Sequence, residues 1–257
     1  MSNVKTFLRF PISFEDKFLI YPPTVNDVVG NDKFGQYQQM LILSHEELED
    51  SFVDKVDDKG QPVNPPTPLE FLLGNAYYNE DFRKIALEAF EFFIHQKVTF
   101  LYEKKAILIG ELEKILLELE NSEDLINFEE KMILLTEENF LNFQNAVRDS
   151  LGLDKVSPPN PNEHPRLKRM KAKARLRDRI KAQKGMGISL EDSLVSICCM
   201  GIGLNPLNIG EISYASVSKL MRRYQEKEKY DIDIRSLLAG ADSKKVQPKY
   251  WIRKLED

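Results

Sequence analysis

Residues 189–257 read SLEDSLVSICCMGIGLNPLNIGEISYASVSKLMRRYQEKEKYDIDIRSLLAGADSKKVQPKYWIRKLED, and this stretch decides the fold of the C-terminal part of the chain. Ser189 is a typical helix N-cap, and the apolar residues after it recur at spacings of three and four. This pattern predicts a helix with one apolar stripe, which Gly201 and Gly203 are expected to end.

The second half of the stretch predicts two more helices and an aromatic tail. Ser213 marks the start of the longer helix, whose apolar side reaches Tyr224, and a shorter helix is predicted over 232–238. The tail carries Tyr250 and Trp251, which need a surface to lie on. We expect Trp251 either to pack on its own domain, the more common outcome, or to contact a partner.

Upstream, residues 1–155 predict an acidic α+β domain. Apolar and polar residues alternate through 7–10 and 18–21, which predicts two paired strands. Two further apolar runs, 98–102 and 106–109, are rich in β-branched and aromatic residues and predict a hairpin. Together the four runs predict a small antiparallel sheet covered by helices.

The helices of this domain are predicted from cap signals and apolar periodicity. Ser44 and Glu47 have the spacing of a capping box, and Thr67 is likewise followed by an acid three residues later. The longest helix, over 79–95, carries a broad apolar face that we place at the centre of the core. Residues 121–135 give no clear pattern. The other helices are predicted over 26–29, 34–43, 111–120 and 136–151.

Residues 156–188 join the two parts of the chain. Four prolines between 156 and 165 predict a stiff, extended spacer and a domain boundary. A helix is predicted over 166–184, where ten Lys or Arg accompany one acid in a chain whose net charge is −5. We therefore predict a mostly helical α+β protein with an acidic α+β domain over 1–155, a spacer and basic linker helix over 156–188, and an all-helical interaction module over 189–257.

The basic helix has two interpretations. Its cations can neutralise phosphates, which predicts a nucleic-acid contact. Against this, no aromatic side chain lies among them to stack on bases, and the acidic body would repel a polyanion. The favoured interpretation is a solvated linker helix or a protein-contact helix, and folding back on the acidic domain is one form that it can take. The candidate nucleic-acid contacts are Arg166, Lys168, Arg169, Lys171, Lys173, Arg175, Arg177 and Arg179.

No set of residues predicts a reaction, a metal site or a cofactor. Cys198 and Cys199 are adjacent in an apolar run, which favours packed, inert thiols and a reducing compartment over a disulfide or a zinc site. The three histidines are far apart in sequence. The first residues lack the apolar core of a signal peptide, and no apolar stretch is long enough to cross a bilayer. We therefore expect a non-enzymatic, soluble, intracellular protein.

The layout resembles the small tail-region proteins of tailed bacteriophages, in particular tail assembly chaperones and baseplate or hub assembly proteins. The resemblance rests on FLIYPP at 18–23, the charged linker, NPLNI at 205–209 before the next helix, and YWI at 250–252. It covers the last third of the chain best. It implies a chaperone or scaffold in the cytoplasm of the infected cell that binds a long, helix-rich tail protein such as the tape-measure protein.

We therefore predict a non-enzymatic phage tail or baseplate assembly protein. Two alternatives stay open: a nucleic-acid-binding protein that uses the helix over 166–184, and a structural adaptor that remains in the virion tail, because the basic helix is longer than a simple linker requires. The predicted partner-binding residues are Leu220, Met221, Tyr224, Tyr250 and Trp251.

Overall fold

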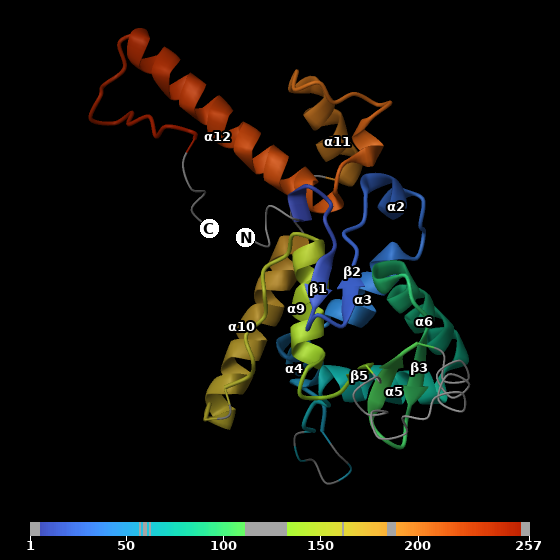
Figure 1. Ribbon diagram of the computed structural model, residues 1–257. Helices are drawn as coiled ribbons and strands as arrows, with labels where there is room; N and C mark the ends of the chain where they lie inside the picture. Colours follow the sequence, from blue (N-terminus) through green and yellow to red (C-terminus); the bar gives the residue numbers. More distant parts are fainter. Residues whose placement is uncertain are drawn as a thin grey trace.

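Figure 1 shows a computed structural model of the chain. The structure describes residues 6–56, 58, 61, 63–110, 133–160, 162–183 and 189–252, and at positions 165 and 178–183 it describes the backbone alone. The predicted class is confirmed: the described part is α+β and mostly helical, with a two-stranded and a three-stranded antiparallel sheet.

Most helices begin where their cap signals place them. Capping boxes are present at Ser44, Thr67 and Ser189, as the local sequence predicts. The helix predicted over 111–120 lies outside the described residues. The described helices are α2 (Val25–Val29), α3 (Phe34–Ile42), α4 (His45–Phe52), α5 (Pro68–Tyr78), α6 (Glu80–Ile94), α9 (Phe140–Ser150), α10 (Pro165–Gln183), α11 (Leu190–Cys199) and α12 (Tyr214–Leu238), with a 3-10 turn, η2 (Ile209–Glu211).

The first hairpin lies later in the chain than the sequence predicts. Its strands are β1 (Ile12–Phe14) and β2 (Phe18–Ile20), so the strand predicted over 7–10 is wrong. Phe14 is buried and packs on Phe18 with ring centroids 5.0 Å apart, whereas both phenylalanines of 7–10 are exposed. The register therefore follows the aromatic pair that enters the core.

The four predicted strands do not form one sheet. The second sheet has the order β3 (Val98–Leu101), β4 (Ala106–Ile109), β5 (Ile133–Leu135), and it is separate from β1 and β2. All four residues of β4 are buried, so this strand needs a partner on each edge. β5 supplies the second edge from the stretch that gave no clear pattern in the sequence.

Helix α6 lies at the centre of the core, as predicted. Ala86, Ala89, Phe90 and Phe93 have no exposed surface. The Phe90 ring stacks on Phe143 of α9, with centroids 5.5 Å apart and an angle of 17° between the planes. Helices α3 and α5 pack on α6, which therefore joins the N-terminal helices to both sheets.

The two helices predicted after Ser213 are one continuous helix, α12, which has 25 residues. Between Tyr224 and Ile232 the sequence contains neither glycine nor proline, so no residue there interrupts the backbone hydrogen bonds. Within the same segment Lys227 Nζ lies 2.9 Å from Asp231 Oδ2, a pair at helical spacing. The gap in the apolar pattern between Tyr224 and Ile232, which predicted the end of one helix and the start of another, therefore does not interrupt α12.

The beginning of the chain holds the start of α12. Tyr214 N donates to Pro23 O at 2.9 Å, and Val25 N donates to Ile212 O at 3.0 Å. The Tyr214 ring meets Phe34 edge-on, with centroids 5.5 Å apart. Val25 shares a small apolar cluster with three residues of the C-terminal part, Ile197, Ile209 and Val217. The division at 156–165 stays a prediction. In the described part of the chain, no helix is both long enough and apolar enough to cross a membrane.

Candidate functional site

The basic helix α10 packs against the acidic helix α4. At their contact Ala172 is almost completely buried, with 2% of its surface exposed. Lys168 Nζ lies 2.6 Å from Glu49 Oε1, and Arg175 Nη2 lies 2.9 Å from Asp50 Oδ1. Part of the positive charge that the sequence offers to nucleic acid is therefore matched by carboxylates of the same chain.

The carboxylates of these ion pairs are largely removed from water. The side chains of Glu49 and Asp50 are 9% and 2% exposed. Burial alone would lower the pKa of Arg175, but its hydrogen bond to Asp50 and the nearby charges of Asp50, Glu46 and Glu49 outweigh burial and raise this pKa. His45 Nε2 lies 2.9 Å from Glu49 Oε1, so this histidine belongs to the same network. Removing one member would leave a buried charge without its partner.

The other candidate cations of α10 have different surroundings. Arg169 donates to Val53 O at 3.3 Å, Lys171 pairs with Glu163, and Lys173 Nζ lies 3.2 Å from Asp54 Oδ1. Two further candidates, Arg166 and Arg177, are exposed and make no ion pair with a described residue. The side chain of the last candidate, Arg179, lies outside the described part.

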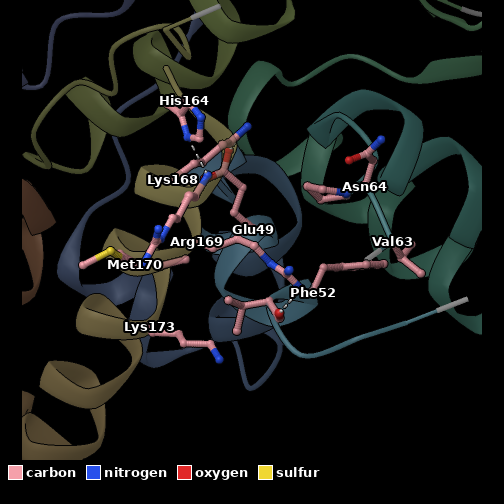
Figure 2. Close-up of a pocket in the computed structure, with 13 residues that line it drawn as sticks. Glu49, Phe52, Val63, Asn64, His164, Lys168, Arg169, Met170 and Lys173 are labelled. Atoms are coloured by element: carbon pink, nitrogen blue, oxygen red, sulfur yellow. Dashed lines mark hydrogen bonds and ion pairs between the residues drawn. The ribbon is translucent and has the colours of Figure 1, made fainter. Parts of the chain in front are cut away.

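A cleft of about 740 Å³ opens between α10, the end of α4 and residues 63–65 (Figure 2). One side carries cations of α10, and Figure 2 shows Arg169 reaching toward Phe52 at the end of α4. The lining residues are Glu49, Phe52, Val53, Val63, Asn64, Pro65, His164, Arg166, Lys168, Arg169, Met170, Ala172 and Lys173. Sequence reasoning missed this cleft because its walls are about 100 residues apart in the chain, and the mixture of cations and apolar residues in α10 was its only signal.

The five predicted partner-binding residues lie on or beside α12. Leu220 and Met221 are half-buried and pack against the apolar cluster that α11 shares with α12. Tyr224 follows one turn later and is also half-buried; a hydrogen bond to Glu228, then burial, raises its pKa. Part of this predicted surface is therefore already used to hold α11 on α12.

Tyr250 and Trp251 pack on α12 from a different side. Arg223 Nη1 donates to Trp251 O at 2.6 Å, and the ring of Tyr230 meets that of Tyr250 with centroids 5.6 Å apart. Trp251 is half-buried, which agrees with packing on its own domain, while 56% of Tyr250 is exposed. The aromatic tail thus lies along the helix that it follows.

The two cysteines differ from the expectation of packed, inert thiols. Cys198 is half-buried and contacts the small apolar cluster, but Cys199 is exposed. Adjacent residues on a helix point about 100° apart, so the apolar side of α11 buries only one of them. Among the described residues, no group of three or more His, Cys, Asp or Glu side chains could hold a metal ion.

The C-terminal part has a recognisable relative among protein families. A family described as the YomV second domain matches residues 180–256, which contain the end of α10, all of α11 and all of α12. This domain family is phage-derived, and YomV comes from a Bacillus prophage. The match supports a phage origin for the chain. No curated protein and no solved structure matches it.

Proposed function

We propose that this chain is a non-enzymatic phage protein that acts as a chaperone or scaffold in tail or baseplate assembly. Its C-terminal module binds a helix-rich tail protein, such as the tape-measure protein, in the cytoplasm of the infected cell. The phage-derived family match over residues 180–256 supports the setting. The resemblance of the layout to phage tail proteins supports the finer role.

The observation that carries the proposal is the position of α12. Its first turns are anchored in the body, while the rest of the helix extends away from it (Figure 1). No residue between 222 and 238 is buried, and the apolar side chains of Ile232 and Leu238 are 57% and 83% exposed. A helix that is held at one end and only partly covered beyond residue 222 offers its uncovered side to another helix, since packed helices gain most of their stability from such contacts.

The experiment is affinity capture of the tagged full-length protein from cells that make all its phage neighbours, with nuclease treatment and mass spectrometry. We expect one long, helix-rich tail protein in stoichiometric amount. Two double variants, Ile232→Glu with Leu238→Glu and Tyr250→Ala with Trp251→Ala, should reduce its recovery at least tenfold. The matched control replaces two exposed apolar residues outside α12, Val29→Glu with Leu153→Glu, and should capture normally.

Two outcomes would contradict this proposal. Tail-protein capture that is unchanged in both double variants would exclude α12 and the aromatic tail beside it as the binding surface. Recovery of nucleic acid alone, lost after nuclease and lost in Arg166→Ala with Arg177→Ala, would favour the nucleic-acid alternative. Presence of the protein in purified virions together with the tail protein would identify it as a structural adaptor.

A further inference from the structure

We propose that the cleft between α10, the end of α4 and residues 63–65 binds a short acidic segment of a partner protein, with an apolar side chain of that segment against Phe52, Val63 and Pro65. This inference does not depend on the proposed function, because it concerns a different surface from α12. It rests on the charge, shape and composition of the cleft wall.

Several cations that line the cleft are not neutralised by a buried carboxylate of the described part of the chain. Arg166 makes no ion pair within the described part of the chain. Arg169 donates to the neutral carbonyl of Val53, and the guanidinium has further N–H groups for a carboxylate. The pair between Lys173 and Asp54 joins side chains that are 54% and 74% exposed, so an incoming carboxylate can replace Asp54 with little loss. Lys168 differs, because the buried Glu49 already matches it.

The opposite wall of the cleft is mostly apolar. Its apolar residues are Phe52 and Val53 at the end of α4 and Val63 and Pro65 in the following segment, where the polar Asn64 also lines the cleft (Figure 2). The volume of about 740 Å³ falls within the range of about 300–1,000 Å³ that is usual for ligand clefts. A ligand that matches both walls has carboxylates on one side and an apolar side chain on the other, which is the chemistry of an acidic peptide.

A nucleic acid matches this cleft less well. One face of the Phe52 ring is covered by Lys55, whose Nζ lies 3.9 Å from the ring centroid, so that face is not open to a base. The neighbouring helix α4 carries Glu46 and Glu47 in its first turn. A phosphate backbone that continued past the cleft would meet these carboxylates, whereas a short peptide ends before them.

The test is fluorescence anisotropy with the full-length protein and a labelled peptide, Asp-Glu-Leu-Phe-Glu-Asp. Two comparison probes are the peptide in which Asn and Gln replace the acids and a labelled oligothymidylate. We expect micromolar binding of the acidic peptide and at least tenfold weaker binding of the other two. The triple variant Arg166→Ala, Arg169→Ala, Lys173→Ala should weaken peptide binding at least tenfold, and so should Val63→Asp.

The control triple variant, Lys104→Ala, Lys155→Ala, Arg177→Ala, removes the same charge from exposed positions outside the cleft and should bind like the parent protein. Thermal unfolding of every variant checks the fold. Equal binding of the neutral peptide, tighter binding of the oligonucleotide, or equal loss in both triple variants would overturn the inference. Peptide binding that persists in the α12 variants, when tail-protein capture is lost, would show that the two surfaces act separately.

Discussion

The Arg175 guanidinium lies 2.9 Å from the Asp50 carboxylate, although the two residues are 125 positions apart in the sequence. The contact joins the basic helix to the acidic helix α4, and Asp50 is almost completely buried beneath it. Through this contact the basic helix is a structural part of the protein. Its other, exposed cations are the ones available to a ligand.

Replacing Arg175 should destabilise the fold. In Arg175→Met the buried Asp50 carboxylate loses its cation, and we expect unfolding free energy to fall by about 2–3 kcal/mol, below the usual cost of breaking a fully buried pair because 28% of Arg175 is exposed. Urea unfolding measures the change. Arg177→Met should change stability by less than about 0.5 kcal/mol. If Asp50→Leu combined with Arg175→Met were no more stable than Arg175→Met alone, the unpaired charge would not be the cause.

Replacing Gly152 should also destabilise the protein. Its φ of +72° is unfavourable for other residues, and an added Cβ would lie 2.9 Å from Ala215 Cβ. We expect Gly152→Ala to cost about 2–4 kcal/mol in thermal or urea unfolding. Gly74 lies inside α5, where an added Cβ meets nothing within 4 Å apart from its chain neighbours and the backbone of its own helix, so Gly74→Ala should be neutral or stabilise by about 0.5–1 kcal/mol. Equal effects of the two substitutions would contradict the close approach of α12.

The contribution of Glu88 to the free energy of unfolding should depend on pH. Hydrogen bonds from Lys33, at 2.7 Å, and from Tyr37, at 3.0 Å, lower the pKa of this carboxyl. Because folding favours the ionised form, the stabilisation is present above the unfolded pKa of about 4.3 and is lost as pH falls through the lower folded value. Glu88→Gln should therefore be less stable than the parent by a few tenths of a kcal/mol at pH 7 and equally stable near pH 2, since the pair is partly exposed.

Urea unfolding of both proteins at the two pH values tests this. A difference that persists undiminished at pH 2 would point to lost packing rather than lost charge. Glu91→Gln on the exposed side of α6 gives the matched control, and we expect it to follow the parent protein at both pH values.

The spacer should be the first site of proteolysis if it is a domain boundary. Val156 is held by two hydrogen bonds with the Asn145 side chain, at 2.7 and 2.9 Å, whereas residues 157–160 are exposed. We therefore expect proteinase K to cut after Val156 and not before it. Mass spectrometry of the fragments gives the position. A spacer that resists cleavage while other segments are cut would mean that the two predicted domains are one unit.

Local signals in the sequence predicted local structure well. Ser44, Thr67 and Ser189 start helices where expected, because a capping box involves residues only three positions apart. The strand β5 was missed because its local pattern is weak and the burial of β4 determines its pairing. The full length of α12 was missed because continuous backbone hydrogen bonding carries the helix through a gap in the apolar pattern.

The candidate site was predicted only in part. The basic composition singled out α10, and its folding back on the acidic part of the chain was one form of the favoured linker interpretation. Which cation meets which carboxylate depends on how two distant helices pack, as Lys168 and Glu49 show. The cleft also forms where segments distant in the sequence pack together, so the periodicity of one segment could not predict it.

The bridge between Thr24 and Ser213 has a consequence for folding during synthesis. The ribosome releases α2 and the first hairpin long before residues 212–214 exist, so the backbone groups that will bind them first face water. Closing a loop of this length is entropically costly and slow compared with forming a local hairpin. We therefore expect docking of α12 to be the last step of folding. The projecting helix then reaches its final position only after the rest of the protein has packed.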